Sequence, residues 1–249
     1  LILCVMVFSG CEKNDFDKIR LQNVTNLRQG SVVTRTEFDY NSHGQLTHMT
    51  KVDSDGDVTY DADIDYNKKN QPVRYRYKFS PSQEEDTTII EWTETGFITY
   101  LGSSHKYVYL LNSDNQISKR YLLYRIEGTS EYDTSAFMDY QWYGKEKLIV
   151  TDSNIYSGMI HTDIFVFAPH PHPYRAINIS LLTLIPFYTL GLQGEQNLYC
   201  PTHLSHSYNS EESYTTMTYR YNESGYPVYA YIRYMEEPDT ERSFQYGIY

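Results

Sequence analysis

Three aspartates separated by single residues, Asp53, Asp55 and Asp57, form the clearest candidate metal site in the sequence. Carboxylates with this spacing in a turn can converge on a hard cation such as Ca²⁺. The loop is not an EF-hand, because Gly56 lies between the second and third aspartates and no glutamate follows at the twelfth position. An Asp-Gly pair between alternating stretches is equally typical of a hairpin turn. Two interpretations therefore stand: a turn that needs no cofactor, or a turn that binds calcium.

Five histidines form a second candidate group. His170 and His172 are separated by one proline on an extended segment, so their side chains would point the same way. His161, His203 and His206 could join them in space, and imidazole nitrogens bind zinc or copper. No Cys or Glu partner stands at ligand spacing. The alternative interpretation is a set of exposed polar residues in and around a proline-rich loop.

Aromatic side chains are the third group, since the 249 residues include 27 Tyr, 10 Phe and 2 Trp. The flat faces of exposed aromatic rings can stack against sugar rings. The candidate ligand-binding residues are Trp92, Trp142, Tyr174, Tyr188 and Tyr199. The competing interpretation is that such rings pack between neighbouring strands and leave their polar atoms in water.

Catalytic motifs are scarce. The chain has no G-x-S-x-G, H-E-x-x-H or P-loop pattern. Ser103 and Lys106 match S-x-x-K in letters, but they precede a predicted strand, where that spacing does not bring the lysine onto the serine. Cys200 is predicted to be a small buried residue rather than a catalytic thiol. Acidic residues are too numerous for their count to argue for or against a glycosidase pair. No catalytic residue is predicted.

Charge argues against a nucleic-acid partner. The chain has 21 basic and 32 acidic residues, a net charge of −11, and a pI near 5.1. A polyanion requires a basic face, and no Lys/Arg cluster is present. The length and the apolar content of 40% suit one large folded domain.

The first residues resemble an export signal. Residues 1–8 are apolar, and Ser9-Gly10-Cys11 resembles a bacterial lipobox, in which Cys11 is lipidated. We therefore interpret 1–10 as a truncated lipoprotein signal peptide and 11–22 as a lipidated tether, with the membrane as partner through the lipid. The alternative is a buried N-terminal strand with an incidental cysteine. Acidic residues after Cys11 resemble the surface-export signal of Bacteroidetes lipoproteins.

Five segments share one template, which reads apolar-x-apolar-(Asn/Thr)-x-x-(Gly/Asn)-x-(apolar/Pro). They are FDYNSHGQL from Phe38, IDYNKKNQP from Ile64, IEWTETGFI from Ile90, YLLNSDNQI from Tyr109 and YRYNESGYP from Tyr219, with a degenerate sixth copy from Tyr140. Positions one and three share a face of a strand. The Asn at position four can open a turn, and the Gly or Asn at position seven tolerates a positive φ. Each segment is therefore predicted to be a hairpin.

Alternating stretches between these segments raise the expected total to roughly fourteen strands. Neighbouring strands in sequence usually pair, so we predict an all-β antiparallel meander of repeated hairpins, strongly curved or closed into a barrel. The single β domain would span 23–249. Residues 168–206 are predicted to be a short helical and loop insertion, with a helix over 177–190 broken at Pro186.

The repeats resemble the YD-type (RHS-type) repeats of bacterial cell-surface proteins. Cys11 followed by such repeats, with a late Asn197-Leu198-Tyr199-Cys200-Pro201, is similar to a set of Bacteroidetes surface lipoproteins of unknown function. The resemblance covers most of residues 23–249. It implies architecture and outer-membrane placement, and it supplies no catalytic residues.

These observations predict a lipid-anchored binding or structural module at the outer membrane, exposed at the surface, with a glycan or protein as partner. One alternative is a carboxylate-dependent enzyme resembling a glycoside hydrolase. Another is a β-barrel carrier of an apolar ligand, with a cavity lined by Tyr and Leu.

Overall fold

Alternation of apolar and polar residues gives strands along the whole described part of the chain, and each strand pairs with its neighbours in sequence. The computed structural model describes residues 19–80, 82–101, 103–114, 116–144, 146–171, 199–208, 211–235 and 238–248. The strands are β1 (Ile19–Arg28), β2 (Ser31–Tyr40), β3 (Leu46–Asp53), β4 (Val58–Tyr66), β5 (Pro72–Lys78), β6 (Asp86–Trp92), β7 (Gly96–Leu101), β8 (His105–Leu111), β9 (Ile117–Arg125), β10 (Tyr132–Tyr143), β11 (Lys147–Asn154), β12 (Ile160–Pro171), β13 (Tyr199–Tyr208), β14 (Glu211–Tyr221), β15 (Pro227–Tyr234) and β16 (Thr240–Ile248).

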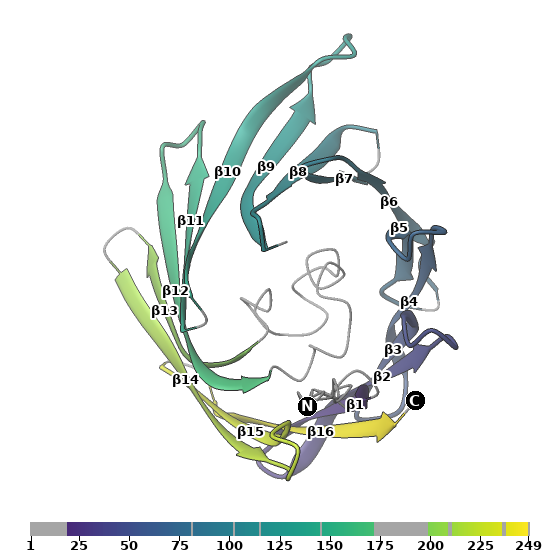
Figure 1. Cartoon of the computed structure of the whole chain (residues 1–249), viewed down its shortest axis with the longest axis vertical. Helices are drawn as coiled ribbons and strands as arrows, with labels where there is room; N and C mark the ends of the chain where they lie inside the picture. The colour runs from purple at the N-terminus through teal and green to yellow at the C-terminus, as the bar shows by residue number, and fades with distance from the viewer. Residues whose placement is uncertain are drawn as a thin grey trace, which may run out of the picture.

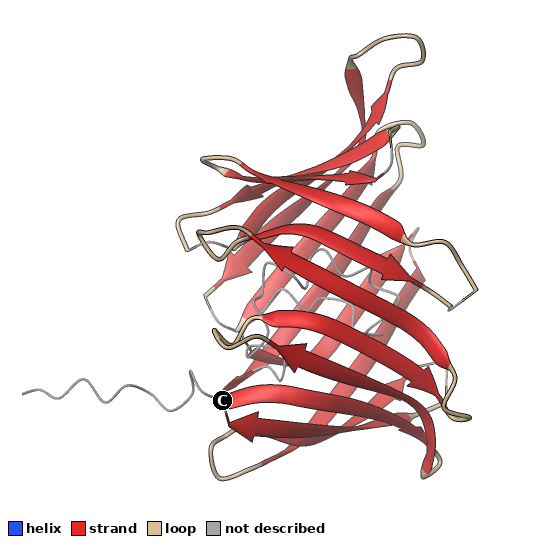
Figure 2. Ribbon diagram, turned by 90° about the vertical axis from the view of Figure 1, so that its right-hand side faces the viewer, coloured by secondary structure: helices blue, strands red, loops and turns tan. Residues whose placement is uncertain are grey.

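All sixteen strands are antiparallel to their neighbours, and β1 pairs with β16 to close the barrel (Figure 1). The strands cross the wall obliquely, as closure of a sheet requires (Figure 2). The predicted all-β antiparallel meander is confirmed, and of the two predicted shapes, a strongly curved sheet or a barrel, the structure has the closed barrel. β1 begins at Ile19, four residues before the predicted start of the domain. The described residues contain no helix with the length and apolar character needed to span a bilayer.

The predicted insertion is wrong at both of its boundaries. β12 continues through Ala168 to Pro171, and β13 already begins at Tyr199, so both ends of the 168–206 range belong to strands. The prolines are accommodated because the pairing of β12 with β13 is irregular there, with register shifts on both sides of Phe167. The helix predicted over 177–190 lies outside the described residues.

The asparagine at position four of the repeat organises the hairpin turns. The Asn41 side-chain oxygen accepts hydrogen bonds from the backbone N–H groups of His43 and Gln45, at 3.0 and 3.1 Å. Its amide group donates to the side-chain oxygen of Gln45 at 2.8 Å. Asn67 and Asn112 make the same set of bonds at their own turns. The predicted role of this asparagine is confirmed at these three turns.

Position seven takes two different conformations. Gly44, Asn70 and Gly225 have φ angles of 71°, 61° and 80°, as the predicted turn requires. Gly96 does not share the positive φ and lies inside β7, where it meets the backbone of Tyr109 in β8. The third repeat therefore needs glycine for close packing of two strands rather than for its turn.

At several repeats, the aromatic residue at position three ties the hairpin to an earlier part of the wall. The Tyr66 hydroxyl donates to the Leu46 carbonyl at 2.7 Å, and the Trp92 indole N–H donates to the Pro72 carbonyl at 2.8 Å. Both carbonyls belong to position nine of the preceding repeat. Equivalent bonds join Tyr40 to Leu21, Trp142 to Ile117 and Tyr246 to Pro227. We call these bonds the repeat clamps; they give the aromatic excess a structural role.

Candidate functional site

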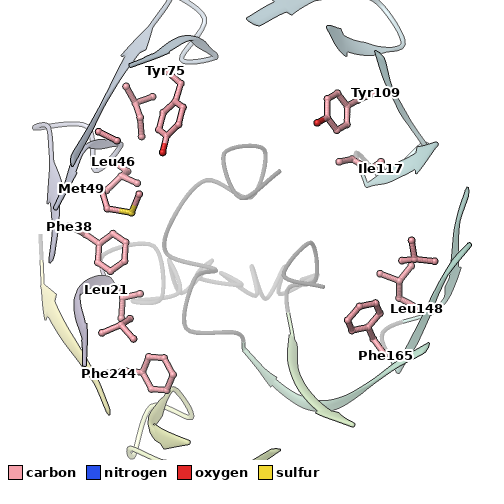
Figure 3. Close-up of a cluster of buried hydrophobic side chains, with 14 of the residues drawn as sticks. Leu21, Phe38, Leu46, Met49, Tyr75, Tyr109, Ile117, Leu148, Phe165 and Phe244 are labelled. Atoms are coloured by element: carbon pink, nitrogen blue, oxygen red, sulfur yellow. The ribbon is translucent and has the colours of Figure 1, made fainter. Parts of the chain in front are cut away.

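The inner face of the barrel wall is apolar and buried. Leu21, Phe38 and Met49 on one side of the ring, and Leu148 and Phe165 on the other, are each at most 3% exposed. Their side chains point from the wall toward the interior (Figure 3). Cross-strand pairs such as Phe38 with Met49 and Leu148 with Phe165 show that the apolar residues of neighbouring strands share this face. The inner wall of the barrel is therefore suited to contact with apolar groups.

The outer face of the same wall is charged where β3, β4 and β5 meet. Asp61, Asp63 and Asp65 alternate with buried residues along β4. Arg74 lies 2.6 Å from Asp65, and His48 lies 3.0 Å from Asp63. Such exposed pairs contribute little to stability. They do show that this part of the outer face is charged and exposed.

Tyr75 carries a polar atom on the inner face without a partner. The side chain is fully buried, and its hydroxyl makes no hydrogen bond within the described structure. The ring stacks on Tyr77, with centroids 5.2 Å apart. Figure 3 shows the hydroxyl directed toward the interior of the barrel. A buried donor that lacks a partner is costly, so this hydroxyl is a candidate for a functional role.

Charged and phenolic groups also belong to the inner face. Burial and the neighbouring Arg242 lower the pKa of Lys51 below its ordinary value. Arg242 is itself only 4% exposed. Burial raises the pKa of Tyr109 to about 12, so its hydroxyl stays protonated at neutral pH. The inner wall is therefore largely neutral and aromatic. Lys51 from β3 and Arg242 from β16 are cations on this wall.

A cluster of three titratable side chains lies between β12 and β13. The His161 Nε2 atom is 2.8 Å from His206 Nδ1 and 3.2 Å from Asp163 Oδ1. The His206 Nδ1 atom is 2.8 Å from the same carboxylate oxygen. The sequence prediction grouped His161 with His206 but missed Asp163. The signal was available, because His-x-Asp on a strand puts both side chains on one face.

The aspartate motif forms a turn. The Asp53 carboxylate accepts hydrogen bonds from the backbone N–H groups of Asp55 and Asp57, both at 3.0 Å. This is the bonding that Asn41 makes in the first repeat. Asp55 and Asp57 are exposed. The turn interpretation accounts for the motif, and calcium binding there stays a prediction.

Of the predicted ligand-binding aromatics, the structure describes the side chains of Trp92 and Trp142. Trp92 and Trp142 pack against the core and use their indole N–H groups in repeat clamps. Tyr174 and Tyr188 lie outside the described residues, as does the side chain of Tyr199.

Of the remaining candidate histidines, the structure describes the side chain of His203. His203 stacks on the exposed ring of Tyr214, with centroids 6.1 Å apart. His172 and the side chain of His170 lie outside the described part of the chain. The Lys106 ammonium lies over the Tyr132 ring at 3.9 Å. Cys200 is buried, as predicted, and burial raises the pKa of its thiol to about 12, which disfavours a nucleophilic thiolate.

No protein-family model matches the sequence. No curated protein matches it either. Among solved structures, the chain is similar to a porin-like protein from Bacteroides uniformis, with 15% identity, 94% of this chain and 96% of that chain covered, and a TM-score of 0.43. What the barrel does must therefore be inferred from its own residues.

Proposed function

We propose that this protein is a lipid-anchored binding protein of the cell envelope that carries an apolar ligand inside its barrel. The observation that supports the proposal is the buried apolar and aromatic inner wall of a closed sixteen-stranded barrel. A barrel of this size encloses more interior than the side chains of its own wall can fill. Ligand sites are usually concave and apolar, with a few placed polar groups, and the Tyr75 hydroxyl is such a group.

The proposed location follows from the N-terminal motif and from the outer face. A barrel that spans a bilayer presents apolar residues to the lipid, and an Arg or Lys at mid-depth costs about 2–4 kcal/mol, an Asp or Glu less. In this barrel the aspartates of β4 and their partners Arg74 and His48 lie on the outer face. The barrel therefore stands in water beside the outer membrane, and lipid on Cys11 would hold it there.

Replacing Cys11 with serine is expected to release the protein from membranes, because lipid on this residue would be the anchor. In cells that export the protein, wild type is expected in the membrane pellet after a high-salt wash, and Cys11→Ser in the soluble fraction. A Cys4→Ser variant is the matched control and should stay membrane-bound. Retention of Cys11→Ser in the washed pellet would contradict the lipid anchor and point to contact through the barrel itself.

The ligand proposal is tested with N-phenyl-1-naphthylamine, an apolar probe that becomes fluorescent in apolar surroundings. We expect saturable binding, competed by a long-chain alcohol and by the alkane of equal length. Tyr75→Phe should weaken competition by the alcohol about fivefold and leave the alkane unchanged, since one hydrogen bond contributes roughly 1 kcal/mol.

Tyr66→Phe is the matched control, because it removes the same atom from a repeat clamp. It should lower the free energy of unfolding by about 1 kcal/mol, since the Leu46 carbonyl loses its donor, and leave competition unchanged. Tyr75→Phe should keep or raise stability, because it deletes a buried hydroxyl that has no partner. Absence of saturable probe binding, or equal competition in wild type and Tyr75→Phe, argues against a ligand at this wall.

A further inference from the structure

We propose that His161, Asp163 and His206 form a binding site for a divalent transition metal, with Zn²⁺ as the representative ion. Each side chain offers one ligand atom, and the three atoms lie within 4.8 Å of one another. Among the described residues, no other group of three His, Cys, Asp or Glu side chains meets this condition. The site lies on other strands than the aspartate turn and Tyr75.

The three contacts cannot all be favourable as hydrogen bonds while Asp163 is ionised. A neutral imidazole nitrogen either donates or accepts, and a carboxylate oxygen only accepts. If both contacting nitrogens carry protons, two donors face each other at 2.8 Å. If one nitrogen lacks its proton, its lone pair faces the Asp163 oxygen at 2.8 or 3.2 Å. A cation bound to all three atoms would be attracted to each of them.

The spacing also suits coordination. Zinc binds imidazole nitrogen and carboxylate oxygen at about 2.0–2.2 Å, so ligand atoms around one ion lie roughly 2.8–3.4 Å apart. The three separations here are 2.8, 2.8 and 3.2 Å. The two rings meet almost at right angles, with an interplanar angle of 79°, so they do not stack face to face. Two imidazoles and one carboxylate are a common ligand set for zinc and for iron.

The fold holds these residues in place without any contribution from a loop. Asp163 in β12 and His206 in β13 are directly opposite each other in the ladder. His161 precedes Asp163 by two residues, so it shares the same face of β12. The face is the inner one, because the next residue along it is the buried Phe165. Three protein ligands leave at least one coordination position for water or for an exogenous ligand.

Metal binding is tested by calorimetric titration of Zn²⁺ into the metal-free full-length chain. We expect one ion per chain, with affinity lowered roughly 100-fold or more in Asp163→Asn and in His206→Ala, since even second-shell changes cost 10–100-fold. Titration with Co²⁺ reports ligand geometry through its visible spectrum, which should disappear in both variants. The asparagine in Asp163→Asn has nearly the same shape as the aspartate, so this variant tests the proposal even if His206→Ala does not fold.

Two histidines outside the site serve as controls. His203→Ala changes the same strand on its outer face, and His48→Ala removes the histidine of the outer aspartate cluster. Both variants should bind Zn²⁺ with the affinity of the wild type. Zinc affinity within threefold of wild type in Asp163→Asn and His206→Ala would overturn the proposal. An equal loss in His203→Ala would overturn it as well, because binding would then not depend on this triangle.

Discussion

Replacing Gly96 with alanine is expected to lower the free energy of unfolding by about 3 kcal/mol, one of the two largest stability effects we expect of a single substitution in this barrel. A Cβ at this position would overlap the Tyr109 carbonyl oxygen and lie 2.9 Å from the carbonyl carbon. Both atoms belong to backbone, so no side-chain rotation relieves the contact. β7 and β8 would have to separate where Gly96 pairs with Leu110.

Gly247 provides the matched control for this substitution. It also lies in a strand without a positive φ, but its added Cβ would meet the side chain of Gln22. A long polar side chain can rotate away, so Gly247→Ala should cost no more than about 1 kcal/mol. Urea unfolding followed by tryptophan fluorescence measures both variants. Similar midpoints for the two variants would show that β7 and β8 are not held as closely as the structure has them.

Truncation of Phe97 to alanine is expected to cost about 4 kcal/mol, through lost burial and the cavity left behind. The ring is 1% exposed and stacks on Tyr109, with centroids 4.4 Å apart and planes inclined by 16°. It also contacts Trp92, with centroids 5.1 Å apart. The substitution therefore removes a ring from a group of three aromatics at the end of the barrel that carries the repeat turns.

Phe137 is the control, because it is the same residue type on the outer face. It pairs with Tyr121 across β9 and β10, with ring centroids 6.5 Å apart, and the Lys119 ammonium lies 5.6 Å from its ring centroid. Phe137→Ala should cost about 1 kcal/mol, as expected for a partly exposed site. Thermal unfolding and urea titration measure the stability of Phe97→Ala and of Phe137→Ala. Equal costs at the two positions would mean that the inner wall is not the packed core of this protein.

The proposed ligand site and the proposed metal site occupy different strands of the same inner wall. Tyr75 belongs to β5, whereas the metal cluster belongs to β12 and β13. The two proposals can therefore fail independently: Tyr75→Phe should not alter zinc affinity, and Asp163→Asn should not alter competition by the alkane.

Local structure could be predicted from the sequence because its causes are local. The Asn at position four of the repeats opens a turn through bonds to backbone two and four residues ahead, as Asn41 does, and these bonds need no other part of the chain. Alternation with period two predicts strands for the same reason. The predicted insertion is wrong at its ends because prolines are rare within a regular ladder, whereas the irregular ladder of β12 and β13 accommodates those at 169 and 171.

The repeat clamps and the metal cluster could not be predicted in full, because they join residues far apart in the chain. The hydroxyl of Tyr66 reaches a carbonyl 20 residues away, and His206 meets Asp163 across 43 residues. Spacing in the sequence does not reveal which strands become neighbours or how their registers align. Asp163 therefore had no visible link to His206 until β12 and β13 were paired.

The sequence by itself determined the hairpins, their turns and the residues that share each face of a strand. Only the tertiary structure decided which face is the inner one and that the sheet closes. Closure depends on β1 pairing with β16, where the Asn23 amide donates to the Gln245 side chain 222 residues away. An alternating strand is compatible with an open sheet or a barrel, and with either face turned inward. Closure decides both the shape of the sheet and the need for an inner face, because one face of every strand must then surround a common interior.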